Sequence, residues 1–226
     1  MNHFAVLMEF LRDRLQFLEN IRDGKYIEKY ILAFAVCSSL FLGLYGGILG
    51  SFSGWLQAIS SAIKLPALYL LTLLICLPSL FFFDVVCGSK RTFWQYCCLL
   101  LASMSVVSIM LFGFAPISLF FRLSMNDYNF FKLLNVVILI VSSFVGVQFF
   151  YRGILFINDI EGVQRKRRDI SVKAWLVLYG FVGSQLGWTL RPIFGSPGKS
   201  FEIFRNLESN FYAHLVHIIS QFFGIN

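Results

Sequence analysis

The chain has 226 residues, of which 58% are apolar and 14% charged, a net charge of +7 and a mean hydropathy of +0.73. Soluble globular domains carry about 25% charged residues, so these values exclude an ordinary soluble domain. The apolar residues form long runs between short charged stretches, which also excludes a disordered tail, a collagen-like fibre and a secreted disulfide scaffold. Composition therefore places this chain in a membrane.

The first 30 residues carry apolar side chains at helical spacing, with charged residues on the remaining surface. We interpret segment 1–30 as a cytoplasmic amphipathic helix and a turn, with the helix lying at the membrane interface. The alternative is that the same stripe packs against a soluble partner or a neighbouring subunit. The stripe consists of Phe4, Leu7, Met8, Leu11, Leu15 and Leu18.

Five stretches are long and apolar enough to cross a bilayer, which requires about 17–25 residues per helix. They cover residues 31–50, 66–87, 93–115, 133–151 and 174–190. We therefore predict an all-α integral membrane protein, with five transmembrane helices in one domain over residues 31–190. The fifth stretch is the shortest and contains Ser184 and Gln185.

Lysine and arginine divide unequally between the two sides of these spans. Segments 1–30, 88–92 and 152–173 fall on one side with thirteen of them, and the other side has six. Positively charged loops resist translocation, so we predict a cytoplasmic N-terminus and an external or luminal C-terminal segment 191–226. No signal peptide is visible before the first span. We expect a multi-pass protein of the bacterial inner membrane.

Glycines recur at helical spacing in the first and fifth predicted spans. Small residues let membrane helices approach closely, so both glycine faces are expected to contact other helices, either within one chain or between chains. The predicted packing residues are Gly43, Gly46, Gly47, Gly50, Gly54, Gly183 and Gly187.

One acidic residue, Asp84, lies inside a predicted span, near its cytoplasmic end. A carboxylate at membrane depth suggests a functional site, and the alternatives are an ion pair with Lys90 or Arg91 and a site for a proton or an ion. Pro78 predicts a bend that improves packing, or a hinge. The candidate intramembrane polar residues are Asp84, Asn135, Gln148 and Gln185.

Basic residues flank the fifth span, and we expect them to contact lipid headgroups rather than nucleic acid. They are Arg165, Lys166, Arg167, Arg168 and Arg191. In the C-terminal segment, residues 207–223 predict a second interfacial amphipathic helix. His214 and His217 share a face of that helix, for which a metal site is the alternative interpretation.

Catalytic motifs are missing from the sequence. The five cysteines lack metal-ligand spacing, and no nucleophile elbow, phosphate-binding loop or dinucleotide fingerprint is present. Paired carboxylates at membrane depth are also missing. We therefore expect a protein without enzymatic activity, metal or cofactor.

Three short motifs resemble the Yip (Ypt-interacting protein) type of five-span membrane protein and its bacterial relatives. They are Ser-Ser-Ala-Ile-Lys-Leu-Pro at 60–66, Cys-Gly-Ser-Lys-Arg-Thr at 87–92 and Phe-Ala-Pro-Ile at 114–117. The resemblance implies a non-enzymatic membrane organiser that works through helix contacts, and it carries over no catalytic residue.

These features predict a scaffold or accessory subunit that works through helix–helix and lipid contacts. The expected partners are the lipid bilayer and other membrane-protein subunits, in a homo- or hetero-oligomer. The alternative is a homo-oligomeric channel or transporter component, in which Asp84, the bend at Pro78 and the polar residues of the spans line a path. The scarcity of charge in the spans and the lack of a visible inverted repeat favour the scaffold.

Overall fold

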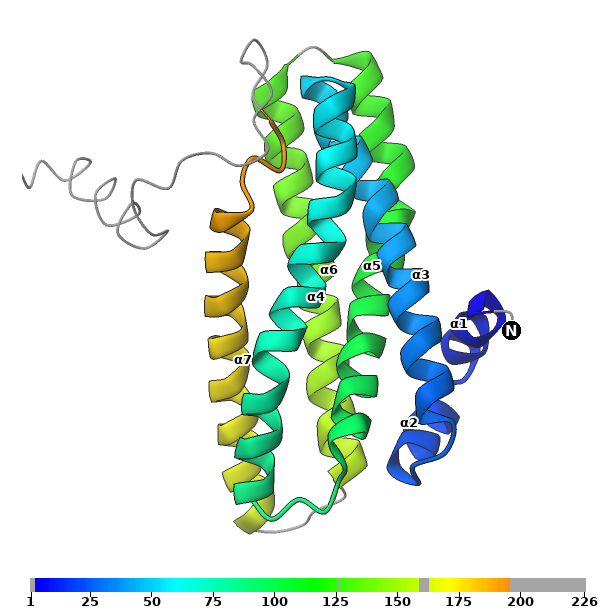
Figure 1. Ribbon diagram of the computed structural model, residues 1–226, viewed down its shortest axis with the longest axis vertical. Helices are drawn as coiled ribbons and strands as arrows, with labels where there is room; N and C mark the ends of the chain where they lie inside the picture. Colours follow the sequence, from blue (N-terminus) through cyan, green and yellow to red (C-terminus); the bar gives the residue numbers. More distant parts are fainter. Residues whose placement is uncertain (1–2, 126, 159–162, 196–226) are drawn as a thin grey trace, which may run out of the picture.

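In a computed structural model of the protein, the described residues are 3–125, 127–158 and 163–195, and all their regular elements are helices (Figure 1). The predicted amphipathic helix at 207–223, with His214 and His217, lies outside this part of the chain. The helices are α1 (His3–Arg12), α2 (Arg14–Arg22), α3 (Ile27–Gly50), the 3-10 turn η1 (Ser51–Ser53), α4 (Trp55–Val86), α5 (Phe93–Ser124), α6 (Tyr128–Asn158) and α7 (Val163–Thr189).

Four of these helices are long and apolar enough to cross a membrane: α3 with η1, α4, α5 and α6. They alternate in direction and form an antiparallel bundle, with α7 beside α4 (Figure 1). The helices α4 and α5 have 32 residues each, or about 48 Å at 1.5 Å per residue, against a hydrocarbon layer of about 30 Å. Their ends therefore extend beyond the apolar layer. The described part of α7 does not reach the same apolarity.

The helix α4 begins at Trp55, eleven residues before the predicted start of the second span, and continues through Pro66 and Pro78. Proline removes a backbone donor and disturbs the preceding turn, so carbonyl groups near it need other partners. Close to Pro78, the indole Nε1 of Trp175 in α7 donates to the Cys76 carbonyl (3.1 Å) and to Ser79 Oγ (3.1 Å). These bonds join α7 to α4 at the proline.

The N-terminal segment forms two helices where the sequence predicted one. The chain breaks at Asp13, whose side chain caps α2 by accepting a hydrogen bond from the Gln16 amide (3.0 Å). Both helices pack against the bundle, where α1 contacts α3 and α2 contacts α5 and α6. The buried residues are Val6, Leu7, Phe10, Phe17, Leu18 and Ile21, whereas Phe4, Met8 and Leu15 of the predicted stripe are exposed.

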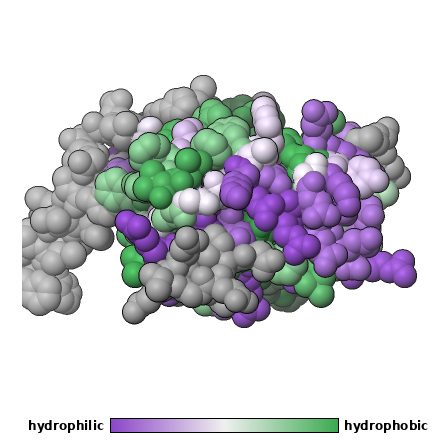
Figure 2. Space-filling view, turned by 90° about the horizontal axis from the view of Figure 1, so that it is seen from below, coloured by the Kyte–Doolittle hydropathy of each residue, from purple (hydrophilic) through white to green (hydrophobic). Residues whose placement is uncertain are grey.

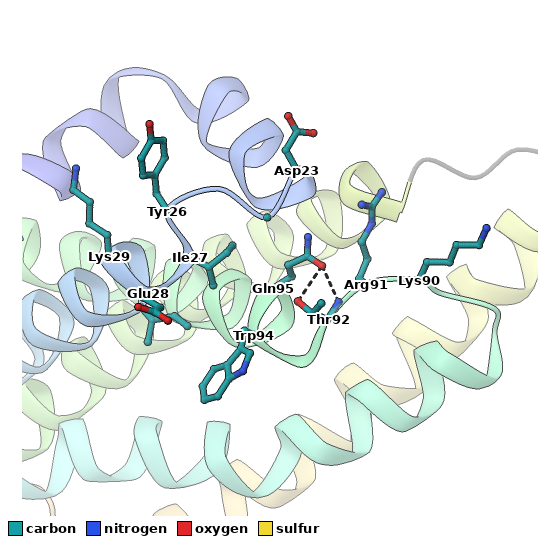
Figure 3. Close-up of a pocket in the computed structure, with 12 residues that line it drawn as sticks. Asp23, Tyr26, Ile27, Glu28, Lys29, Lys90, Arg91, Thr92, Trp94 and Gln95 are labelled. Carbon is teal, nitrogen blue, oxygen red and sulfur yellow. Dashed lines mark hydrogen bonds between the residues drawn. The ribbon is translucent and has the colours of Figure 1, made fainter.

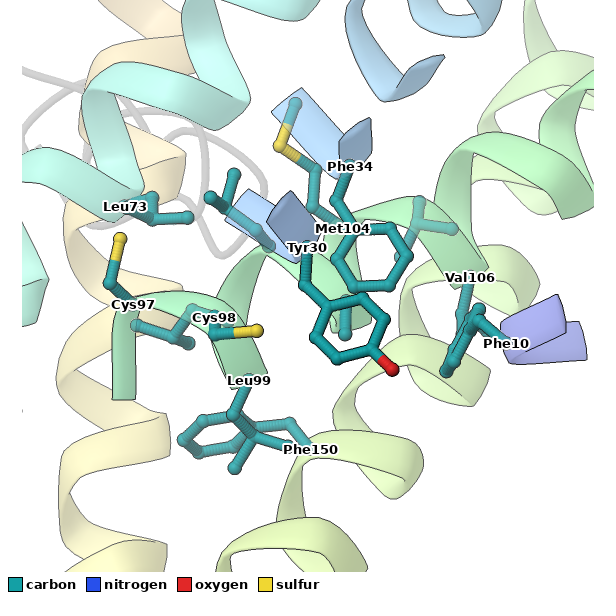
Figure 4. Close-up of a cluster of buried hydrophobic side chains, with 14 of the residues drawn as sticks. Phe10, Tyr30, Phe34, Leu73, Cys97, Cys98, Leu99, Met104, Val106 and Phe150 are labelled. Carbon is teal, nitrogen blue, oxygen red and sulfur yellow. The ribbon is translucent and has the colours of Figure 1, made fainter. Parts of the chain in front are cut away.

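The helices α1 and α2 together are called the N-terminal hairpin below. Aromatic side chains join this hairpin to the bundle core (Figure 4). Phe10 lies 5.1 Å from Phe34 of α3 and 5.5 Å from Phe149 of α6, measured between ring centres, and Phe17 lies 5.0 Å from Tyr30. Buried aromatic pairs contribute about 0.5–1.5 kcal/mol beyond their area. The hairpin is therefore part of the folded unit.

Glycines of α3 face α4. A Cβ atom added at Gly46 would overlap the Ser61 carbonyl group, and one added at Gly50 would lie 2.7 Å from Ser61 Oγ. The same atom at Gly43 would lie 3.3 Å from the Ala62 carbonyl oxygen, and at Gly47 3.9 Å from the Ala62 Cβ. These two helices thus approach within a distance that side chains would prevent, and the contact is within one chain.

The other predicted packing glycines lie in more open positions. Gly183 faces Thr72 of α4, with 3.6 Å from its would-be Cβ to Thr72 Cγ2. Gly187 has no described atom within 4 Å of that position. Gly54 belongs to the turn between η1 and α4, where its φ of 117° requires glycine.

Candidate functional site

A buried ion pair connects α4 and α7 at one end of the bundle. We call this the basic end: it is formed by α2, the turn at 87–92, the end of α6 and the start of α7, and hydrophilic residues gather over it (Figure 2). The Nε of Arg168 donates to Asp84 Oδ1 at 2.6 Å, and the two side chains are 1% and 3% exposed. Buried charges are stable only when they are paired and hydrogen-bonded.

Three further side chains complete the network around this ion pair. Tyr96 OH and Asn158 Nδ2 both donate to Asp84 Oδ2, the second at 3.1 Å. Ser89 Oγ lies 2.6 Å from Tyr96 OH and donates to Asn158 Oδ1 at 3.0 Å. We call Asp84, Arg168, Tyr96, Asn158 and Ser89 the ionic cluster. Its members come from α4, α5, α6, α7 and the turn between α4 and α5, so it fixes all of these together.

The turn that carries Ser89 also holds the N-terminal hairpin. Thr92 and Gln95 form a capping box at the start of α5. The Gln95 Nε2 donates to the carbonyls of Ile21 (2.6 Å) and Arg22 (3.1 Å), and Arg91 Nη1 donates to the Arg22 carbonyl at 2.8 Å. The last carbonyls of a helix have no partner inside it, so these bonds satisfy the end of α2.

Replacement of Gln95 by leucine should release the hairpin. It removes the bonds from Gln95 Nε2, so that the Ile21 carbonyl keeps only the Gly24 amide (3.0 Å) and the Arg22 carbonyl only Arg91. A lost hydrogen bond of this kind costs about 0.5–1.5 kcal/mol. We expect faster limited proteolysis between α2 and α3 than in the unmodified protein. A Lys90→Gln variant is the control, because Lys90 is exposed in the same turn, and equal proteolysis rates in the two variants would contradict this role of Gln95.

A cleft of about 890 Å³ opens at the basic end between the start of α3 and the start of α5 (Figure 3). Tyr26 and Trp94 at this cleft are exposed aromatic residues, which are typical of membrane interfaces. Its charged residues have both signs: Asp23, Glu28, Lys29, Lys90 and Arg91. A hydrogen bond from Lys25 lowers the pKa of Asp23, so that carboxylate is charged at neutral pH.

The ionic cluster is suited to joining helices. Both carboxylate oxygens of Asp84 accept hydrogen bonds, while Nη2 of Arg168 donates to the Cys87 carbonyl at 3.4 Å. Nη1 of Arg168 is buried without a hydrogen-bond partner among the described residues. In the same part of the chain, no three histidine, cysteine or acidic side chains are grouped as metal ligands.

The four predicted intramembrane polar residues are not brought together. Asp84 is at the basic end, paired with Arg168 and not with Lys90 or Arg91. Asn135 lies near the opposite end of α6, Gln148 is exposed on α6, and Gln185 is half-buried on α7. No hydrogen bond between described residues joins any two of them, so they do not form one site.

Asn135 instead belongs to a buried triad. Tyr45 OH donates to Asn135 Oδ1 at 2.7 Å, and Ser118 Oγ donates to the same oxygen at 2.8 Å, which links α3, α5 and α6.

Hydrogen bonds between membrane helices contribute on average about 0.6 kcal/mol and at most about 1.7 kcal/mol to stability. A Tyr45→Phe variant should lose stability in that range in detergent unfolding titrations. A loss above 3 kcal/mol would indicate a packing role instead.

The residues predicted to contact lipid headgroups also lie in different places in the structure. Arg167 is exposed, but Arg168 lies inside the protein in the ionic cluster, and not at the lipid surface where the sequence prediction put it. The guanidinium of Arg191 lies 3.6 Å from the ring centre of Trp188. The side chains of two members are outside the described part of the structure: Arg165 and Lys166.

Sequence reasoning missed a second polar contact, at the opposite end of the bundle. There Gln57 Nε2 and Lys64 Nζ donate to the Pro192 carbonyl at 2.9 and 3.3 Å, and Ser61 Oγ donates to the Ile193 carbonyl. The three donors are spaced four and three residues apart, on one face of α4. This spacing was the signal that could have predicted both the early start of α4 and its polar face.

Comparisons of this chain with models of protein families, with curated proteins and with solved structures find no match. The resemblance to the Yip type therefore stays a prediction from the sequence. The arrangement of the helices supports a membrane-embedded, multi-pass helical protein.

Proposed function

We propose that this protein is a non-catalytic membrane scaffold or accessory subunit, which works through contacts of its outer helix faces with lipid and with other membrane proteins. A role of this kind is also what the Yip resemblance implies. The observation that carries the proposal is the pairing of polar groups inside the bundle. The ionic cluster, the triad of Tyr45, Ser118 and Asn135, and the contacts of α4 with Pro192 and Ile193 all use partners from the same chain.

Apolar side chains then remain for the outer surface. Large exposed apolar residues lie on the outward faces of the bundle helices, for example Leu74 and Phe82 on α4, and Ile140 and Phe144 on α6. In a membrane such faces meet lipid tails or other apolar helices. The glycines at 43, 46 and 50 are already used between α3 and α4, so other subunits must contact other faces.

A scaffold explains the polar groups better than a conducting path does. The ionic cluster and the Asn135 triad are on opposite halves of the bundle. Between these levels lie mainly buried apolar residues, among them Leu99, Ala102 and Leu111 of α5. Among the buried serines at this depth, Ser38 is bonded to Ser105 and to the carbonyl of Phe34 in its own helix. A permeation path would need polar groups that continue through this region.

Subunit composition in native membranes tests the proposal. Vesicles from the native membrane should release this chain in a complex with unlike membrane subunits at fixed stoichiometry, measured by native mass spectrometry. A symmetric ring of identical chains around a hydrated passage would refute the scaffold and favour the channel. Ion flux through the purified protein in liposomes would do the same.

Five spans, with α7 as the fifth, fit this proposal. The helix α7 is bonded to α4 near both ends of α4, through Arg168 at the basic end and through residues 192–193 just after α7 at the other. Because α4 is long enough to cross the membrane, a helix bonded at both levels traverses the same depth. The basic end then faces the cytoplasm, following the distribution of positive charge.

Reporter fusions at the two termini provide the corresponding prediction. With five spans, an N-terminal reporter should be active on the cytoplasmic side and a C-terminal reporter on the outer side of the inner membrane. A fusion after Asn158 serves as the control, because four spans bring the chain back to the cytoplasm there. If both terminal reporters are active in the same compartment, α7 does not cross the membrane and the prediction of five spans is wrong.

A further inference from the structure

A groove on the side of the bundle lies between the N-terminal hairpin and the helices α5 and α6. Its volume is about 470 Å³, within the range of ligand sites of about 300–1,000 Å³. Its walls are mainly apolar, with Leu15 from α2, Met110 from α5 and Phe149 from α6. The groove forms where Leu18 of α2 approaches Gly153 of α6, whose would-be Cβ lies 3.4 Å from Leu18 Cδ2.

Two arginines line this groove, Arg14 at the start of α2 and Arg152 on α6. Both are exposed, and among the described residues neither forms an ion pair or a hydrogen bond through its side chain. No acidic residue of the described chain lines the groove. The cleft of Figure 3 differs in this respect, because Asp23 and Glu28 line it together with its cations.

We infer that this groove binds an acidic phospholipid, with the phosphate between Arg14 and Arg152 and an acyl chain along the apolar walls. The inference rests on the proposed membrane location. Arginine matches phosphate through paired N–H donors, and basic pockets between membrane helices recognise acidic headgroups. No negative charge within the groove opposes such a ligand.

The depth of Arg152 agrees with this ligand. The helix α6 has 31 residues, or about 46 Å, and so exceeds the hydrocarbon layer of about 30 Å at both ends. Arg152 lies six residues before the end of α6, about 9 Å from it. This puts Arg152 at the boundary between the hydrocarbon layer and the headgroups on the side of the basic end, from which a long arginine side chain reaches the phosphates. Met110 and Val145 lie deeper along the groove.

The test uses the full chain in nanodiscs that contain phosphatidylglycerol and phosphatidylethanolamine. Native mass spectrometry counts the phosphatidylglycerol molecules that stay bound as its share in the nanodisc is raised. For Arg14→Gln/Arg152→Gln we expect about 30-fold weaker retention, from about 1 kcal/mol per basic residue near an acidic lipid. Met110→Trp, which fills the apolar part and leaves both charges, should also reduce retention.

The matched control is Arg12→Gln/Arg167→Gln, which removes two exposed arginines that do not line the groove, one at the end of α1 and one near the start of α7. It should retain phosphatidylglycerol like the unmodified protein. Equal losses in both double variants would show diffuse surface attraction and refute the groove. Displacement of the lipid by glycerol phosphate alone would also refute it, since a bound acyl chain resists a soluble headgroup.

Circular dichroism of each variant excludes misfolding as the cause of a loss of lipid retention. If the glutamine variant fails to fold, Arg14→Lys/Arg152→Lys takes its place, which keeps both charges and should keep the retention of the lipid. Unchanged retention in a folded Arg14→Gln/Arg152→Gln protein overturns the inference. The native mass spectra also report the number of subunits, so the scaffold proposal and the lipid site can fail separately.

Discussion

An Asp84→Asn variant should lose about 3–5 kcal/mol of unfolding free energy, because the Arg168 guanidinium, 1% exposed, then lies buried without a negative partner. The loss should appear in a titration with denaturing detergent. The α7 helix should separate first, since this ion pair is one of its main bonds to α4. A rise in the solvent exposure of Trp175, read from its fluorescence, reports that separation.

The control for this prediction removes both charges. In Asp84→Leu/Arg168→Met no charge is left buried, and replacement of a buried ion pair by apolar residues is often neutral or stabilising by about 1–4 kcal/mol. Tyr96 OH then keeps Ser89, and Asn158 Nδ2 keeps the Ile154 carbonyl, as partners. The double variant should therefore be clearly more stable than Asp84→Asn. If Asp84→Asn is as stable as the double variant, the ion pair does not form in the membrane.

Part of the N-terminal hairpin could be predicted from local sequence. The apolar spacing predicts helix there, and Asp13 followed three residues later by Gln16 is a typical helix start, which marks the break between α1 and α2. Its location against the bundle was not predictable. The sequence predicts one helical face from Phe4 to Leu18, whereas two helices with separate phases bury Phe10 and Phe17.

The four long spans were predictable for a different reason. A bilayer demands a continuous apolar run of a fixed length, and this signal is local. The ionic cluster was not predictable, because Asp84 and Arg168 are 84 residues apart in the sequence and Arg168 stands in a run of basic residues that has a sufficient topological explanation. Which arginine turns inward depends on the rotation of α7 against α4.

Glycine spacing predicted the contact of α3 with another helix, but not its strength, which a Gly46→Val variant would measure. The added Cβ would lie 3.0 Å from the Ser61 carbonyl carbon and closer to its oxygen, and backbone atoms cannot move aside as a flexible side chain can. Overpacking costs about 1–3 kcal/mol and sometimes more, and the β-branched side chain puts the expected loss near 3 kcal/mol. The Gly47→Ala variant is the control on the same helix, since its Cβ would meet Ala62 at an ordinary 3.9 Å. In detergent unfolding titrations, Gly46→Val should therefore lose most of these 3 kcal/mol relative to Gly47→Ala. Equal stability of the two variants would mean that α3 and α4 are farther apart in the membrane than in this structure.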